Sequence, residues 1–152
     1  MTATTYDKPL PDVNDPGTAP FWAATREGEV RVQRCGECDY LRWPPGPVCP
    51  ECLSRDAAWI PVQPTGRLVT FCVYHRAFHK GFAADVPYAV GYVELDSGPR
   101  LYAAIVGELD ALEIGAAVRA VFDPVTPEVT LVRFAVVAEP GAQQGETTGG
   151  AR

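Results

Sequence analysis

From Thr65 to about Ala138, short apolar runs and alternating apolar and polar positions are separated by turns rich in Gly, Pro and Asp. This is the pattern of β-strands that pack at least one face inward. It predicts five strands, at Arg67–His75, Pro87–Leu95, Arg100–Val106, Ala117–Phe122 and Glu128–Val137. Between the third and the fourth strand, residues 108–115 predict one or two helical turns that end at a glycine. This order is that of an OB-fold barrel, so the fold class is predicted as mainly β.

The first predicted strand carries apolar side chains on both faces, including Leu68, Val69, Phe71 and Val73. Such a strand fits a barrel whose outer surface is covered, either by the N-terminal part of the chain or by a partner. Cys72 lies in the middle of the same strand, and we expect it to be a small buried hydrophobic residue.

The first part of the chain predicts smaller elements. Residues 1–17 are rich in Pro and Asp and predict an irregular arm. With Thr18 as N-cap, Pro20 in the first turn and Gly28 at the end, the sequence then predicts a short helix. Phe21 and Trp22 of this helix would dock on a neighbouring element. The alternation in residues 29–34 predicts a strand, and residues 57–62 predict a returning one.

Four of the five cysteines form two C-x-x-C pairs, Cys35 with Cys38 and Cys49 with Cys52, with ten residues between the pairs. Two thiolates three residues apart on a tight turn can both point inward, and two such turns supply a tetrahedral shell for a metal ion. We expect Gly36 to give the first turn a positive φ. The spacing predicts a structural metal site, because a closed four-thiolate shell leaves no position open for a substrate.

Zinc is the expected metal, because structural ribbons of this kind usually hold it. Iron in a rubredoxin-like site is an alternative, and the chain would then be an electron carrier. A third interpretation, that the four cysteines are unrelated core residues, is disfavoured because paired C-x-x-C motifs seldom arise by accident.

These patterns divide the chain into four predicted segments. They are an N-terminal arm and short helix at 1–28, a zinc ribbon at 29–63, a five-stranded barrel at 64–138 and a tail at 139–152. The tail has no large apolar side chain, and we expect it to be disordered.

The formal net charge is −6, from 13 Lys and Arg against 19 Asp and Glu. Nucleic-acid-binding proteins usually present a basic surface to phosphates, whereas the basic residues here are scattered among acidic neighbours. A nucleic-acid-binding module, the role of many OB-folds and zinc ribbons, is therefore only an alternative. The sequence has no long apolar run and no basic start followed by an apolar stretch, so we expect no membrane association and a cytoplasmic location.

The segment Tyr74–Phe82 contains both histidines of the chain, three aromatic residues and two basic residues. It lies where a long loop should follow the first barrel strand. Aromatic-rich loops supply anchors at interfaces, so the segment predicts contact with a ligand or a partner. The predicted contact residues are His75, Arg76, Phe78, His79, Lys80, Phe82 and Tyr88.

No catalytic residue is predicted. The sequence has no Ser/His/Asp order, no glycine-rich phosphate loop and no HExxH motif. Neither histidine has a carboxylate partner or a nucleophile close to it in the sequence. A proton relay through His75 or His79 stays open as an alternative.

An ordered set of motifs connects these features. It consists of Phe21-Trp22, the two cysteine pairs with Arg42-x-Pro-Pro between them, Trp59, Gly66-x-Leu-Val-Thr, Val86-Pro-Tyr88, the run from Val93 to Leu101, and Leu112-x-Ile-Gly115 with Val118. From about Phe21 to Val137, the chain resembles the DUF35 family of OB-fold proteins with a rubredoxin-like zinc ribbon. It departs from the family at Ala116, which follows a glycine where the family often has a methionine.

The resemblance implies an accessory subunit without a catalytic centre of its own. Members of this family associate with thiolase-fold enzymes that act on acyl-CoA thioesters, bridge enzyme subunits and help to form the channel for the CoA arm. Their partners include lipid-transfer-protein-like aldolases, which cleave steroid side chains by a retro-aldol reaction. The histidine segment followed by Val-Pro-Tyr is most similar to members paired with these aldolases or with MaoC-like hydratases.

The expected assembly is therefore a hetero-oligomer with a thiolase-fold aldolase, with the acyl-CoA substrate at the shared interface. A subunit of a thiolase-type acyltransferase or of a MaoC-like hydratase complex is the alternative.

Overall fold

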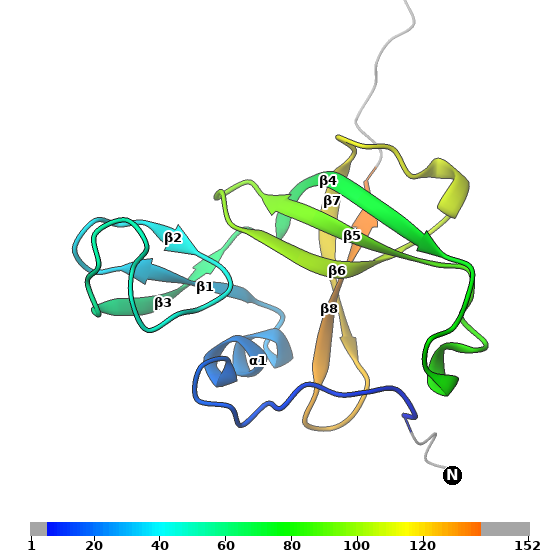
Figure 1. The fold of residues 1–152 in the computed structure, drawn as a ribbon, viewed down its shortest axis with the longest axis horizontal. Helices are drawn as coiled ribbons and strands as arrows, with labels where there is room; N and C mark the ends of the chain where they lie inside the picture. The colour runs from blue at the N-terminus through cyan, green and yellow to red at the C-terminus, as the bar shows by residue number, and fades with distance from the viewer. Residues whose placement is uncertain (1–5, 138–152) are drawn as a thin grey trace, which may run out of the picture.

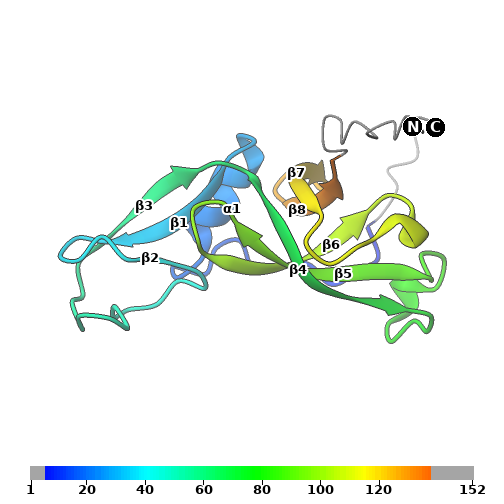
Figure 2. The same cartoon turned by 90° about the horizontal axis from the view of Figure 1, so that it is seen from above.

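The structure, a computed structural model, describes residues 6–137. A three-stranded sheet and a barrel lie at opposite ends of the long axis (Figures 1 and 2). The sheet contains β1 (Val30–Cys35), β2 (Leu41–Arg42) and β3 (Ala57–Val62), in the antiparallel order β2-β1-β3. The only α-helix of the described residues, α1 (Ala19–Arg26), contacts β1 of the sheet and both β7 and β8 of the barrel.

The barrel is closed and has the strand order β4-β5-β6-β8-β7. Its strands are β4 (Thr65–Tyr74), β5 (Tyr88–Leu95), β6 (Arg100–Val106), β7 (Ala117–Pro124) and β8 (Thr130–Val136). Neighbouring strands are antiparallel except β6 and β8, which are parallel. Short 3-10 helices follow β4 (η1, Lys80–Phe82) and β6 (η2, Leu109–Ala111). Five strands with a helical turn between the third and the fourth confirm the predicted OB-fold class.

A β-bulge in β4, between Leu68 and Thr70, changes which side chains face inward. Leu68 is fully buried in the barrel. Unbroken alternation would place Cys72 on the same face as Leu68, but after the bulge Cys72 faces outward and is exposed. The prediction of a buried cysteine was therefore wrong, because a bulge reverses the alternation.

Helix α1 ends as predicted, since Gly28 has a φ of 77°. Thr18 occupies the N-cap position, but its side chain does not cap the helix; its hydroxyl donates to Oδ2 of Asp15 at 3.0 Å. The helix is fixed to the barrel by the buried Thr25, whose hydroxyl donates to the carbonyl oxygen of Thr130 at 2.9 Å.

One hydrophobic cluster runs through the helix, the sheet and the barrel. The ring of Phe21 in α1 lies 4.3 Å from the ring of Trp43. Val32 of β1 and Phe134 of β8 are buried in the same cluster. Because these elements share one core, the structure gives no packing boundary between the predicted segments, and their limits stay a prediction.

The first five residues and the predicted tail, 139–152, lie outside the described residues. Within the described range, no helix has the length and apolar character needed to cross a bilayer.

Candidate metal centre and aromatic end surface

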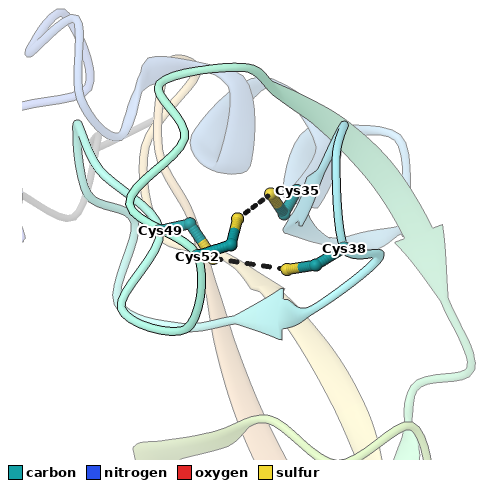
Figure 3. Close-up of side chains that lie close together, drawn as sticks. All are labelled: Cys35, Cys38, Cys49 and Cys52. Carbon is teal, nitrogen blue, oxygen red and sulfur yellow. Dashed lines mark hydrogen bonds between the residues drawn. The ribbon is translucent and has the colours of Figure 1, made fainter.

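The ribbon brings four sulfur atoms together from two loops (Figure 3). Cys35 ends β1 and Cys38 lies in the turn that follows, whereas Cys49 and Cys52 belong to the loop between β2 and β3. All four Sγ atoms lie within 4.8 Å of one another. Two Sγ pairs are closer, 3.5 Å for Cys35 and Cys52 and 3.6 Å for Cys38 and Cys49. A tetrahedral zinc–thiolate shell has sulfurs about 3.8 Å apart, so the four donors have nearly the spacing that a metal ion requires.

The two cysteine turns contain equivalent backbone hydrogen bonds. The N–H of Cys35 donates to the carbonyl oxygen of Tyr40 at 2.9 Å. The N–H of Cys49 donates in the same way to the carbonyl oxygen of Ser54, also five residues further along, at 2.8 Å. The first cysteine of each pair is buried and the second is exposed. The repeated turn therefore places each pair of sulfurs in the same way around a common centre.

Gly36 does not have the predicted positive φ. The left-handed residues are instead Asp39 (φ 58°) and Leu53 (φ 64°), each directly after the second cysteine of its pair. The side chain of Asp56 lies against Gly36, and a Cβ at this position would overlap it in its present conformation. The N–H of Gly36 donates to the carbonyl oxygen of Asp56 at 3.0 Å, which connects the first turn to the start of β3.

The backbone also polarises the thiols. The N–H groups of Cys38 and Glu37 donate to the Cys35 sulfur and lower its pKa to about 6. The N–H of Tyr40 lowers the pKa of Cys38, but the thiol of Cys52 and burial raise it more, and the resulting pKa is about 12. Four sulfurs this close cannot all be ionised unless a cation lies between them. The cluster is therefore suited to a metal cation that prefers thiolate ligands.

The predicted contact segment forms a surface at the end of the barrel far from the ribbon (Figure 1). We call it the aromatic end surface, formed by Tyr74, Phe78, Phe82 and Tyr88. Pairing of β4 with β5 brings Tyr74 opposite Tyr88, and their rings stack with centroids 5.1 Å apart. Phe82 also stacks on Tyr88 at 5.3 Å. Phe78 meets Tyr74 edge-on and is 77% exposed, so this surface presents an uncovered aromatic side chain.

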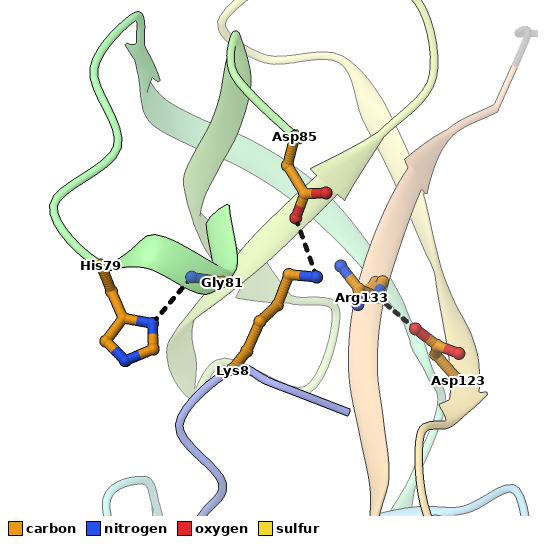
Figure 4. A network of polar contacts seen from close by, with 6 residues as sticks. All are labelled: Lys8, His79, Gly81, Asp85, Asp123 and Arg133. Atoms are coloured by element: carbon orange, nitrogen blue, oxygen red, sulfur yellow. Dashed lines mark hydrogen bonds and ion pairs between the residues drawn. The ribbon is translucent and has the colours of Figure 1, made fainter. Parts of the chain in front are cut away.

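The two histidines differ in their contacts. His79 accepts a hydrogen bond at Nδ1 from the N–H of Gly81 at 3.1 Å and so caps η1 (Figure 4). This contact gives His79 a structural role in the loop. His75 is exposed, and no hydrogen bond or ion pair joins its side chain to another of the described residues.

Two cations flank the exposed Phe78. The guanidinium carbon of Arg76 lies 5.9 Å from the centroid of the Phe78 ring, and Lys80 is exposed at the start of η1. Neither side chain has a carboxylate partner within the described residues. The surface therefore combines an exposed aromatic side chain with positive charge that no described carboxylate neutralises.

The N-terminal arm completes this surface, which the sequence did not predict. Nζ of Lys8 lies 3.2 Å from Oδ2 of Asp85 (Figure 4). It also lies 5.6 Å from the centroid of the Phe82 ring. A cavity of about 510 Å³ lies between the arm and the barrel, and its lining includes Tyr6, Pro9, Tyr74, Phe78, Phe82, Tyr88 and Arg133. No local pattern links the arm to a loop so far along the chain.

Two family profiles match consecutive parts of the chain. The family profile described as "ChsH2, rubredoxin-like zinc ribbon domain" matches residues 22–57. The profile described as "ChsH2, C-terminal OB-fold domain" matches residues 59–123.

Relatives of similar sequence include two hydratase subunits. A "Probable enoyl-CoA hydratase alpha subunit" from Thermomonospora curvata is 37% identical over 129 residues, 84% of this chain and 39% of that protein. A "3-oxo-4,17-pregnadiene-20-carboxyl-CoA hydratase alpha subunit" from Mycobacterium tuberculosis is 31% identical over 106 residues, 69% of this chain and 33% of that protein. The chain thus spans less than half the length of either subunit.

A "DUF35 domain-containing scaffold protein" from Methanocaldococcus jannaschii is 32% identical over 91 residues, 59% of this chain and 64% of that protein. The solved structure of an "Ltp2-ChsH2(DUF35) aldolase" contains a chain that is 35% identical, with a TM-score of 0.74, covering 85% of this chain and 98% of that one. A DUF35 protein of unknown function from Sulfolobus solfataricus shares the fold at 12% identity, with a TM-score of 0.59 and coverage of 83% and 89%. With its ribbon and barrel matched in order, the chain belongs to the DUF35 family.

Proposed function

We propose that this chain is a non-catalytic accessory subunit of a thiolase-fold, lipid-transfer-protein-like enzyme that cleaves a steroid side chain, held as a CoA thioester, by a retro-aldol reaction. The observation that supports this proposal is the similarity to a chain of the Ltp2-ChsH2(DUF35) aldolase. The match covers 98% of that chain and 85% of this one. The Mycobacterium tuberculosis relative supports the substrate class, since its name specifies a pregnadiene carboxyl-CoA.

The aromatic end surface is the proposed contact with the partner enzyme. Exposed aromatic side chains supply most of the binding free energy at many interfaces when a partner covers them. Phe78 offers such an anchor. The unneutralised Arg76 and Lys80 favour a partner or a substrate group of negative charge, such as the phosphates of CoA.

We further propose that the four-cysteine cluster holds zinc and that the ion stabilises the ribbon. The donor set consists of sulfur alone and leaves no ligand position for a substrate. Bond cleavage would therefore take place in the partner enzyme, and this chain would support the shape of the shared acyl-CoA channel.

A hydratase complex is the second candidate. Two relatives are named as hydratase alpha subunits, and each matches this chain over only part of its own length. In that case the chain would support a MaoC-like hydratase in place of the aldolase.

Co-expression with a candidate thiolase-fold aldolase tests the proposal. We expect the two chains to elute together in size-exclusion chromatography, and we expect retro-aldol cleavage of a steroid side-chain CoA thioester only when both are present. Phe78→Ala should weaken the association at least about fivefold. Ile114→Ala is the matched control, because Ile114 is 72% exposed but lies outside the aromatic end surface.

Two outcomes contradict the proposal. One is full activity of the aldolase without this chain, and the other is thioester turnover by this chain alone. The same assay with a MaoC-like hydratase, measuring hydration of an enoyl-CoA, separates the two candidates.

A further inference from the structure

An apolar groove follows the outside of the barrel where β6 and β8 separate. Two cavities lie there. One, of about 510 Å³, lies under the N-terminal arm, and the other, of about 360 Å³, lies against α1. Ala104, Leu131 and Arg133 line both cavities, so the two adjoin. We call them together the β6–β8 groove. Each volume falls in the range of about 300–1,000 Å³ that is usual for small-molecule sites.

The floor of this groove is a small side chain. Buried and outward-facing residues alternate along β6, and Ala104 faces outward between Tyr102 and Val106. Val90 of β5 pairs with Ala104 and lines the same space. β6 pairs with β8 only over its last two residues, so no described strand covers the rest of this edge of β6. The fold therefore leaves room above Ala104.

Aromatic side chains line both ends of the groove. The cavity against α1 is lined by Trp22 of the helix, Trp43 of the ribbon loop and Tyr102 of β6. The cavity under the arm is lined by the whole aromatic end surface and by Tyr6. A small floor between aromatic walls favours a flat, rigid and mostly apolar molecule.

One polar group limits the ligand further. Among the described residues that line the groove, only Arg133 is charged. Its side chain is 27% exposed, and its Nε donates to Oδ2 of Asp123 at 2.7 Å, so the charge is already neutralised. Figure 4 shows another nitrogen of Arg133 on the side away from Asp123. A guanidinium has five N–H donors, so this one can still donate to a ligand oxygen, and its ion pair favours a neutral acceptor such as a ketone over an anion.

We propose that the β6–β8 groove binds the ring system of a ketosteroid. Ala104 and Leu131 contact the rings, and Arg133 donates a hydrogen bond to a ketone oxygen. The inference rests on the proposed function, because the steroid substrate of that proposal selects this ligand among flat apolar molecules. The groove includes the aromatic end surface, which is the proposed contact with the partner enzyme. The steroid rings therefore lie next to the enzyme that cleaves the side chain.

Titration of the full chain, loaded with zinc, tests this inference. Androstenedione and decanoate are added separately, and the NMR signals of the Ala104 and Leu131 methyl groups are followed. The methyl group of Ala58 is the control, since Ala58 is exposed on β3 and lines neither cavity. We expect saturable shifts at Ala104 and Leu131 but not at Ala58. Androstenedione should bind at least about tenfold more tightly than decanoate, because a rigid ring system loses less conformational freedom than a flexible chain.

Two results of this titration would overturn the inference. One is the absence of saturable shifts at Ala104 and Leu131 with androstenedione. The other is equally tight binding of decanoate, which would assign the groove to acyl chains.

Variants test the floor and the donor separately. Ala104→Phe fills the floor and should weaken androstenedione binding at least about tenfold, whereas Ala58→Phe, the matched control, should not change it. Arg133→Met removes the donor and should weaken binding about fivefold. Its control is Arg119→Met, since Arg119 is exposed on β7 and lies outside the groove. Unchanged affinity in Ala104→Phe or in Arg133→Met would overturn the inference, and Arg133→Met decides if Ala104→Phe does not fold.

The titration uses the chain without a partner, so its failure differs from failure of the proposed function. A chain that supports the co-expressed aldolase but does not bind androstenedione would contradict only the groove. A chain that binds androstenedione but has no effect on the aldolase would contradict only the proposed function.

Discussion

Lys8 and Asp85 form an ion pair that joins the N-terminal arm to the loop of the aromatic end surface. The Lys8 side chain is only 18% exposed, and its Nζ also lies 5.3 Å from the ring centroid of Tyr6. The ammonium group is thus held by a carboxylate and by aromatic faces at the same time. A partner that binds this end of the barrel would meet the arm as well as the loop.

Removing this ion pair should weaken partner binding. We expect Lys8→Met to lower the affinity for the partner enzyme by up to about fivefold, because a partly exposed pair contributes at most about 1 kcal/mol. Asp85→Asn should have the same effect. Calorimetric titration of the partner into each variant measures the affinity.

A double-mutant cycle provides the control for this prediction. The double variant should bind no more weakly than either single variant, because both remove one interaction. Arg55→Met, which changes an exposed cation on the ribbon, should leave the affinity unchanged. Additive losses at Lys8 and Asp85 would contradict the ion pair as the cause.

We expect a bound metal to contribute a large part of the free energy of unfolding of the protein. We expect Cys35→Ser and Cys52→Ser to lose stoichiometric zinc and several kcal/mol of unfolding free energy, because the binding free energy of a structural metal contributes directly to folding. Cys72→Ser is the matched control, since Cys72 is an exposed cysteine outside the cluster. Elemental analysis and thermal melting measure both effects. Unchanged zinc content in Cys52→Ser, or a red iron-containing protein, would contradict the assignment.

Metal uptake should release protons. The pKa of Cys38 is raised to about 12. The pKa of Cys52 is also raised; the N–H of Ser54 and the thiol of Cys38 lower it, but burial and the thiols of Cys35 and Cys49 raise it more. Both thiols are therefore protonated at neutral pH and must lose their protons to bind a metal. The apparent metal affinity should fall as the pH falls.

The size of this proton release should also depend on pH. The thiol of Cys35, with a pKa of about 6, becomes protonated only when the pH falls below that value. More protons should therefore be released per metal in acidic buffer than in neutral buffer. Calorimetry in buffers of different ionisation enthalpy counts the protons, and a release of zero at neutral pH would contradict this account.

His79 should matter for the loop and not for bond cleavage. We expect His79→Ala to lower the activity of the assembled complex only a few-fold, because it removes the cap of η1 without removing a reacting group. His75→Ala should have a smaller effect, since no described contact holds His75. Activity is measured at saturating concentration of each variant, so that weak assembly does not affect the result. A loss of about a hundredfold or more with intact assembly would instead indicate general acid–base catalysis.

Short sequence patterns were enough to predict the features that depend on residues close together in the chain. Two C-x-x-C spacings were enough to predict that four sulfurs meet, because each spacing fixes a tight turn. The positions of the five barrel strands along the chain followed from the alternation of apolar residues and from turn signals such as Gly98, which has a φ of 108°. The error at Cys72 arose because a single bulge reverses the alternation without leaving a signal in the sequence.

Contacts between distant segments were not predictable in the same way. Lys8 meets Asp85, and Arg42 shares a cavity with Ser97, only because the folded strands bring these residues together. Arg42 belongs to a motif of the sequence, but the motif does not predict that Gln33 and Gly46 accept from two of its nitrogens and leave Nη1 without a partner.

Helix α1 binds the barrel through Thr25 and packs Phe21 against Trp43 of the ribbon loop. The ribbon therefore has no hydrophobic interior of its own, and we expect the described part of the chain to unfold as one cooperative unit. A shortage of the ion during synthesis would then expose the whole polypeptide to proteolysis and not just its cysteine loops. The supply of one trace element would in this way set the cellular abundance of this chain, and with it that of the proposed enzyme complex.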